Sequence, residues 1–256
     1  MAQHEHNQGQ EPRPWIIRVG SRLRRRIDRI STASSIIPVE PLLSEEHFSW
    51  TKAIAEHWED IAAEADTVIR HREAIPPLRE LSPDHRNTGR DGKWRSFFLF
   101  GYGYKVPENC ARAPKTAALM EKVPDLNSAF FSILDPGATI PRHRGVTRGL
   151  ITCHLGVKIP KDAPKCWIEV EDQKTHWNNG KWLVFDDCFE HEVANETDEM
   201  RVVLLVQVKR PMRLLGKLVH DTWLWAIRKS PFVQDARKNF DKWEEAFATA
   251  EANEPA

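Results

Sequence analysis

Two histidines and one arginine have the side-chain types and the spacing of a metal site that also binds an organic acid. His143 follows a turn-rich segment over 135–142, His191 lies ten residues before Arg201, and Arg201 begins an apolar run over 202–206. Imidazole is a good ligand for iron, and a planar guanidinium can hold a carboxylate through two parallel hydrogen bonds. The three residues therefore predict a metal and a carboxylate bound in one pocket.

The elements that must position these residues are short strands. Six apolar segments are bounded by Pro, Gly, Asn or Asp, over 96–104, 127–134, 150–159, 166–170, 181–185 and 201–208. Short strands separated by turn signals are typical of an all-β sandwich or barrel. One helix is expected between the strands, near 115–122.

Strand alternation selects further candidates for the pocket. Successive side chains of a strand point to opposite faces, so a buried Arg201 would need an anionic partner to offset its desolvation, and a ligand carboxylate could supply one. Thr152 and His154 share one face by the same alternation, and Ser132 lies on the strand before His143. A strand histidine is more often a hydrogen-bonded core or surface residue than a ligand, so these positions need supporting context.

Helices are expected on both sides of this core. Apolar residues recur at spacings of three and four after Ser44, a plausible N-cap, and predict a helix over 44–75. The same spacing returns over 212–250 in the C-terminal part. We therefore predict one catalytic domain over 44–256, with a β core over about 94–211 and helices that cover it.

The first 43 residues read as a polar and basic arm with a linker. Arginines alternate with apolar residues over 14–30, and 31–41 reads as linker. Two interpretations have equal weight: an amphipathic helix that makes peripheral contact with an anionic membrane or a partner, and a solvated basic arm.

Composition narrows the class of protein. The chain has 256 residues, 41% of them hydrophobic, and a formal net charge of zero, so it can bury a core and lacks the basic excess of a nucleic-acid-binding domain. Its four cysteines form no CxxC pair, and neither a long apolar signal core nor a membrane-spanning stretch is apparent. We expect a cytoplasmic protein, with the arginine-rich arm as its contact to any membrane and with no nucleic-acid partner.

Several of these segments together resemble the aspartyl/asparaginyl β-hydroxylase family. The resemblance spans roughly 94–211, in order, and rests on residues 131–137, the H-x-G of 143–145, residues 154–157, residues 185–187 with 189–192, and Arg201. It implies a double-stranded β-helix, that is, a cupin-like jelly roll, with the metal at its open end. It also implies an iron(II)- and 2-oxoglutarate-dependent dioxygenase that uses O2 to hydroxylate an unactivated C–H bond.

The resemblance assigns roles residue by residue. His143 and His191 match the two iron-binding histidines, and Arg201 matches the arginine that pairs with the distal carboxylate of 2-oxoglutarate. Ser132 and His154 match positions that also touch this cosubstrate. Both histidines and Arg201 are thus the expected catalytic set.

Two positions depart from related enzymes. Many such dioxygenases have a carboxylate two residues after the first histidine, where this chain has Gly145, so an aspartate introduced there is expected to reach the metal. Asp186 and Asp187 are the nearest other carboxylates in sequence and are interpreted as shaping the turn before His191. The family's substrate-side arginine is replaced by Thr152, which argues against a peptide-aspartate substrate.

A second set of segments resembles the bacterial lipid A hydroxylases, which modify an acyl chain. It comprises residues 41–44 with 56–58, 93–98, 166–170 and 209–212. Those enzymes usually carry an N-terminal membrane anchor and a carboxylate at the third ligand position, neither of which is apparent here. The substrate stays open between an aspartyl or asparaginyl residue, a related small molecule and a lipid acyl chain.

Two functions from different classes follow. The first is a 2-oxoglutarate-dependent hydroxylase, and the alternative is a non-catalytic jelly-roll sensor that binds metal and 2-oxoglutarate. The combined presence of both histidines with Arg201, Ser132 and His154 favours the enzyme, because a barrel that binds no acid has little need of a buried arginine.

Overall fold

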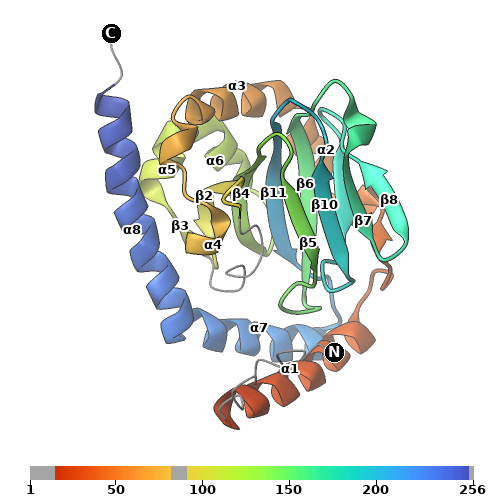
Figure 1. Cartoon of the computed structure of the whole chain (residues 1–256). Helices are drawn as coiled ribbons and strands as arrows, with labels where there is room; N and C mark the ends of the chain where they lie inside the picture. Colours follow the sequence, from red (N-terminus) through yellow and green to blue (C-terminus); the bar gives the residue numbers. More distant parts are fainter. Residues whose placement is uncertain (1–14, 82–90, 254–256) are drawn as a thin grey trace, which may run out of the picture.

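Two antiparallel sheets form the centre of the molecule. The computed structural model describes residues 15–81 and 91–253 (Figure 1). One sheet has seven strands in the order β1 (Leu42–Leu43), β9 (Trp182–Phe185), β6 (Leu150–Lys158), β11 (Arg201–Lys209), β4 (Leu126–Leu134), β2 (Trp94–Gly101) and β3 (Tyr104–Lys105). The other has β5 (Thr139–His143), β10 (His191–Asn195), β7 (Cys166–Val170) and β8 (Gln173–His176). The predicted jelly roll with flanking helices is confirmed, and all six predicted apolar segments lie on strands of it.

The two faces of the large sheet pack against different layers. On β11, Val203 belongs to an apolar cluster shared with Ile168 and Val193 of the small sheet. Its neighbours Val202 and Leu204 belong to a second cluster that includes helical residues. Because strand side chains alternate between faces, one continuous apolar run serves both the inter-sheet core and the helical layer. Arg201 is thereby directed between the sheets.

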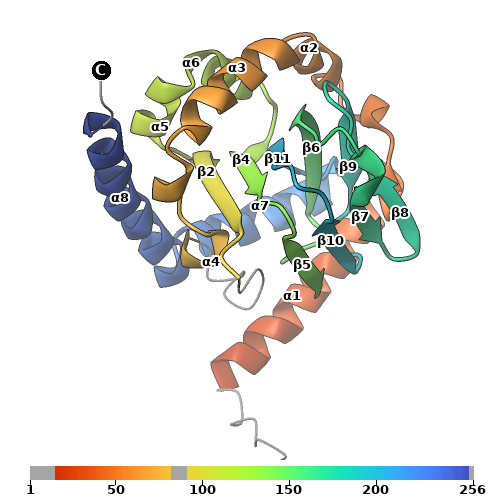
Figure 2. The same ribbon diagram turned by 45° about the horizontal axis from the view of Figure 1, so that its top comes forward.

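Helices cover the outer face of the large sheet, as both views show (Figure 2). They are α2 (Thr51–Ala55), α3 (Trp58–Ile69), α5 (Pro107–Arg112) and α6 (Pro114–Met120), with α4 (Leu78–Leu81) and the short 3-10 turns Glu45–His47, Arg72–Ala74 and Ala163–Lys165 nearby. The single helix expected over 44–75 is thus divided. The backbone leaves helical geometry at His57, with φ −106° and ψ 16°, so two short helices replace one long one. Ser44 caps only a 3-10 turn.

Three longer helices complete the fold: α1 (Trp15–Ser34), α7 (Leu214–Arg228) and α8 (Pro231–Ala252). Arg112 of α5 is ion-paired with Glu244 and Glu251, which attaches α8 to the helical layer. In Figure 1, α1 and α7 lie together below the sheets, at the end opposite α2 and α3. Residues 1–14 of the predicted arm lie outside the described residues. The described part of the arm is a helix, which extends to Ser34 and so into the expected linker.

Strands β5 and β10 were missed by the sequence prediction, and they carry the two histidines. Only Ile140 is buried among the five residues of β5, which leaves too little apolar alternation to recognise. The two strands pair antiparallel with His191 opposite His143. Long-range pairing therefore defines the site.

None of the helices in the described ranges is long and apolar enough to cross a membrane.

Candidate metal and carboxylate site

A cavity of about 320 Å³ opens between the two sheets. Its wall includes all five residues predicted from the sequence: Ser132, His143, His154, His191 and Arg201. Strands from both sheets contribute, since Ser132, His154 and Arg201 come from the large sheet and the other two from the small one. The folded chain thus brings the predicted residues together.

The two histidine rings lie side by side. Their centroids are 4.1 Å apart. Nδ1 of His143 lies 2.9 Å from the carbonyl oxygen of Pro141, and Nδ1 of His191 lies 3.0 Å from that of Phe189. A carbonyl only accepts, so each Nδ1 carries the proton and donates. The lone pair of each neutral ring is then on Nε2, the tautomer that a metal-binding imidazole needs.

Burial keeps both rings neutral. Desolvation lowers the pKa of His191 to about 4, with the charge of His143 as a smaller cause. Burial also lowers the pKa of His143. Both imidazoles therefore hold an unprotonated nitrogen at neutral pH, as metal coordination requires.

Arg201 is buried without a carboxylate partner among the described residues. Its side chain is 1% exposed, its Nη1 donates to the backbone oxygen and the hydroxyl of Ser132, and its Nε has no partner. The Trp177 ring lies under the guanidinium, 4.7 Å from centroid to Cζ. Desolvation lowers its pKa to about 10, so it stays charged at neutral pH. A buried cation of this kind needs an anion.

His154 supplies a second donor beside Arg201. The indole Nε1 of Trp177 donates to Nδ1 of His154 at 3.2 Å, so the proton of the neutral ring is on Nε2. That buried Nε2 has no partner. The pKa of His154 lies well below its usual range, mainly because the ring is buried and to a smaller extent because Arg201 is charged. The cavity thus offers an unsatisfied N–H from each of two residues.

Trp177 was missed by the sequence prediction. It is 1% exposed and is the only hydrophobic residue in the polar stretch over 171–181. A single tryptophan in a polar stretch was the available signal in the sequence, because so large an apolar side chain is usually mostly buried.

Asp187 fills the space beside Gly145. A Cβ built on Gly145 would overlap the Asp187 carboxylate, and Gly145 N donates to the backbone oxygen of Asp187 at 2.6 Å. Asp187 Oδ2 accepts hydrogen bonds from Thr152 Oγ1 at 3.0 Å and Gln207 Nε2 at 3.3 Å, whereas its buried Oδ1 has no partner. Interpreting Asp187 only as a turn residue was therefore incomplete, since it lines the cavity.

The surroundings of Asp187 raise the pKa of its carboxyl group. Burial first, and then the neighbouring charge of Asp186, raises the pKa of Asp187 to about 7, although its hydrogen bonds with Thr152 and Gln207 oppose the change. The side chain is therefore poised to gain or lose a proton near neutral pH, an uncommon property for a carboxyl group.

Another part of the cavity wall is apolar, and two arginines line the cavity as well. Leu78, Phe98, Phe130 and Val146 form an apolar wall. Arg24 of α1 and Arg144 also line the cavity, with side chains that are about half exposed. The cavity therefore suits an extended apolar group attached to an anionic or polar head.

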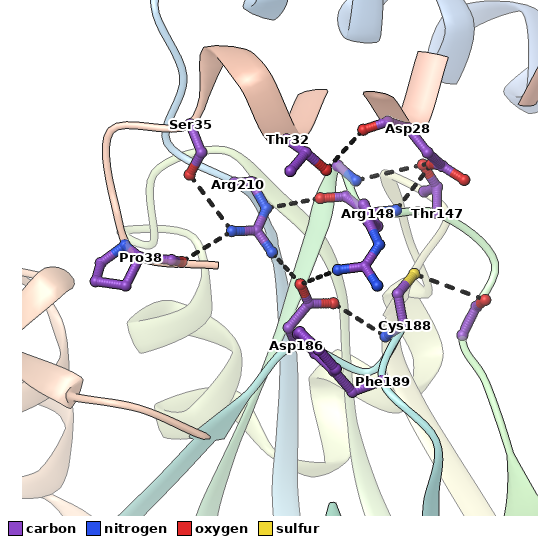
Figure 3. A network of polar contacts seen from close by, with 12 residues as sticks. Asp28, Thr32, Ser35, Pro38, Thr147, Arg148, Asp186, Cys188, Phe189 and Arg210 are labelled. Carbon is purple, nitrogen blue, oxygen red and sulfur yellow. Dashed lines mark hydrogen bonds and ion pairs between the residues drawn. The ribbon is translucent and has the colours of Figure 1, made fainter. Parts of the chain in front are cut away.

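A buried polar network holds the loops next to the two histidines (Figure 3). Arg210 is fully buried in an ion pair with Asp186, and it also donates to the backbone oxygens of Arg148 and Pro38. Asp186 Oδ1 accepts from Cys188 N at 3.0 Å. The network thus joins the segment after α1 to the turn that precedes His191.

Asp28 connects α1 to the same network (Figure 3). Its carboxylate accepts hydrogen bonds from Thr147 Oγ1 at 2.8 Å and Arg148 N at 2.9 Å. Arg148 in turn lies 3.5 Å from Asp186 and stacks over the Phe189 ring. Helix α1 is therefore fixed to the loops that follow His143 and precede His191.

Asp186, Asp187 and Cys188 also form a group whose potential ligand atoms all lie within 4.8 Å of one another. Two arginines already neutralise Asp186, and burial raises the pKa of the Cys188 thiol far above its usual value. A thiol must lose its proton to bind a metal, so the histidine pair is the better metal candidate.

Comparison with known proteins defines the family. The sequence profile of the aspartyl/asparaginyl beta-hydroxylase family matches residues 55–211. The ornithine lipid ester-linked acyl 2-hydroxylase of Rhizobium tropici is 36% identical over 217 residues, which cover 83% of this chain and 76% of that protein. The chain therefore belongs to the aspartyl/asparaginyl β-hydroxylase family, a family of hydroxylases.

Other matches cover a smaller share of this chain. The aspartyl/asparaginyl beta-hydroxylase of Homo sapiens is 32% identical over 165 residues, which cover 62% of this chain but 21% of that protein. A Pseudomonas putida prolyl-4-hydroxylase structure has a TM-score of 0.38 and 16% identity, covering 62% of this chain and 98% of that one. That structural likeness is too weak to carry a conclusion about function.

Proposed function

We propose that the protein is an iron(II)- and 2-oxoglutarate-dependent dioxygenase that hydroxylates a lipid acyl chain. The observation that carries the proposal is the buried, carboxylate-free Arg201 in the same cavity as the His143–His191 pair. A soluble fold rarely buries a guanidinium without an anion, and here the wall beside it offers a second unsatisfied donor on His154.

The residues present fit iron(II). His143 and His191 would hold it through Nε2, because their Nδ1 protons are committed to backbone carbonyls. Two imidazoles suit iron(II) as part of a non-haem site. The chemistry that a bound iron(II) supplies is the activation of O2, coupled to decarboxylation of 2-oxoglutarate to succinate.

The residues present also fit 2-oxoglutarate. Arg201 would hold the distal carboxylate, with the N–H of His154 Nε2 as a further donor and Trp177 fixing both side chains from below. Ser132 accepts from Arg201 Nη1 and Trp94 Nε1, so its own hydroxyl proton remains available to the ligand. Charge-assisted hydrogen bonds of this kind are stronger than those between neutral groups.

Asp187 completes the proposed centre. It is a half-buried carboxyl group with one partnerless oxygen, and it lies against Gly145, the sequence position at which related dioxygenases have a carboxylate residue. Within the described residues it does not share a close ligand cluster with both histidines. We therefore assign it to accept a hydrogen bond from a water in the third protein-ligand position, with Thr152 and Gln207 orienting it.

The substrate assignment rests on the other half of the cavity. The apolar wall of Leu78, Phe98, Phe130 and Val146 suits a hydrocarbon chain better than an aspartyl side chain. The position of the substrate-side arginine is Thr152, and its hydroxyl is committed to Asp187. The Rhizobium tropici relative, which matches most of this chain, is named as an acyl 2-hydroxylase.

The test has two readouts. Purified protein with iron(II), ascorbate and 2-oxoglutarate is expected to release succinate, and incubation with an ornithine-lipid or mixed lipid extract is expected to add one oxygen to an acyl chain by mass spectrometry. Binding of 2-oxoglutarate without any succinate would instead support the non-catalytic sensor. Oxygen added to an aspartyl peptide and to no lipid would overturn the acyl substrate.

A further inference from the structure

An exposed apolar surface lies on α1 and α7. Every large hydrophobic side chain that is exposed in the described residues lies on these two helices or, for Ile36, just after α1. Leu215 is 79% exposed and Trp225 62% exposed. Scattered exposed leucines are ordinary, but a concentration on two adjoining helices marks an interaction surface.

The apolar residues form one face of α7. Leu214, Leu215, Leu218 and Trp225 follow helical spacing, whereas Gly216 and His220 on the opposite side are buried. A Cβ on Gly216 would overlap Ser34 of α1, so the two helices cross in close contact at this point. The buried side of α7 is thus used for packing, and its outward side has no partner among the described residues.

The adjoining helix α1 is rich in positive charge. The sequence of α1 contains six arginines and one aspartate. Arg25, Arg26 and Arg29 are exposed, and so are Leu23 and Ile30 on either side of them in the sequence. Arginines interleaved with apolar residues, and a tryptophan beside them, match the interface of an anionic bilayer, which attracts cations and takes up apolar side chains.

The same surface borders the mouth of the cavity. Arg24 of α1 lines the cavity, and the hydrogen bonds of Asp28 with Thr147 and Arg148 fix α1 to the loop after His143. Figure 1 shows α1 and α7 side by side at this end of the molecule. If α1 and α7 dock on a surface, the mouth of the cavity would therefore face that surface.

We infer that the α1–α7 face, defined by Leu23, Ile30, Leu214, Leu215, Leu218 and Trp225 with the exposed arginines of α1, docks on an anionic lipid bilayer. A second copy of the chain fits less well, because a two-fold interface would place the arginine-rich helices against each other. Delivery of an acyl chain to the cavity rests on the proposed function, but docking itself does not.

The experiment is co-sedimentation of the full chain with phosphatidylcholine vesicles, with and without phosphatidylglycerol, at low and moderate salt. Iron and 2-oxoglutarate are left out. The wild-type protein is expected to bind only the vesicles that contain phosphatidylglycerol. Arg25→Glu/Arg26→Glu is expected to lower the partition coefficient by about tenfold or more at low salt, since each basic residue near an anionic surface contributes to binding.

A second variant tests the apolar part. Leu215→Gln/Leu218→Gln keeps helix propensity but removes exposed hydrocarbon, and it is expected to lower binding by about tenfold at moderate salt, where screening leaves the apolar contribution dominant. The matched control is Lys52→Glu/Lys161→Glu. It makes the same charge change at two exposed positions, one on α2 and one shortly after Lys158, which is ion-paired with Asp66 of α3. This control should bind almost like the wild type.

The outcomes separate the two proposals. Succinate release without lipid, measured on the same preparations, should be equal in all variants, since none of the substituted residues lines the cavity. Absence of wild-type binding at low salt would overturn the docking assignment, whatever the succinate result. A dimer that dissociates in Leu215→Gln/Leu218→Gln, with no vesicle binding, would assign the face to a second copy. Vesicle binding without succinate release would support docking and count against the proposed chemistry.

Discussion

Gly145 and Asp187 occupy one position beside the paired histidines: the Asp187 carboxylate lies where a side chain at residue 145 would begin. A carboxylate therefore does lie next to residue 145, and it comes from the loop before His191. Because this space is filled, an aspartate at residue 145 would have to displace the Asp187 carboxylate before it could reach a metal.

Gly145→Asp is accordingly predicted to lower iron affinity and succinate release by displacing Asp187. In Gly145→Asp/Asp187→Gly the space is vacated, and the new carboxylate can replace the old one. We expect iron titration to show weaker binding in the single variant and partial recovery in the double variant. Equal iron affinity in wild type and Gly145→Asp would show that the overlap is relieved without consequence.

The histidine pair is predicted to be essential for metal binding. His143→Ala or His191→Ala should abolish iron-dependent succinate release, because one imidazole cannot hold the ion in place. His47→Ala is the control, since His47 is exposed on the 3-10 turn after Ser44. Calorimetry measures iron binding by each protein, and mass spectrometry measures the succinate that each releases. Succinate release at the wild-type rate from His191→Ala would show that His191 does not belong to the site.

Arg201→Lys is predicted to weaken cosubstrate binding by about 2 kcal/mol, roughly thirtyfold in the half-saturating 2-oxoglutarate concentration. The ammonium keeps the charge but loses the fork that can hold a carboxylate at two points. A titration of 2-oxoglutarate against both proteins, with circular dichroism to verify folding, measures the effect. Equal half-saturation would mean that the guanidinium does not contact the cosubstrate.

Arg210→Met is predicted to destabilise the fold by about 3 kcal/mol, because Asp186 would remain buried with only the more distant Arg148. Arg210→Met/Asp186→Asn should lose less than the sum of the two single variants. Urea unfolding of the four proteins gives the coupling energy. Strict additivity would show that the two side chains contribute independently.

Helix α7 is predicted to confer a pH dependence through His220. Burial lowers the pKa of His220 to about 4 in the folded chain, below the ordinary 6.5. Between these values the unfolded chain binds more protons, so the stability contribution is present above about pH 6.5 and is lost as the pH falls toward 4. From pH 7.5 to 5.5 this loss is about 1 kcal/mol. Urea unfolding of wild type and His220→Gln at both values isolates it, and parallel pH profiles would contradict the assignment.

The sequence by itself determined six apolar strand segments and the five predicted residues of the cavity. The apolar run Val202 to Val206 identified β11, and because strand side chains alternate between two faces, it placed Arg201 on the face shared by Val203 and Leu205. The family resemblance added His143, His154 and His191, since motif order survives in sequence. The large strands could be predicted because each carries its own apolar signal.

Only the tertiary structure decided how the site is completed. β5 and β10 have little apolar alternation and exist because they pair with each other, nearly fifty residues apart in the chain, which places His143 opposite His191. The Asp187 carboxylate lies in the space that Gly145 leaves open. Trp177 is buried beside His154, to which its indole donates a hydrogen bond. The arginine-rich helix became part of the cavity mouth through Asp28. Contacts between distant segments have no local period, so no window of the sequence contains them.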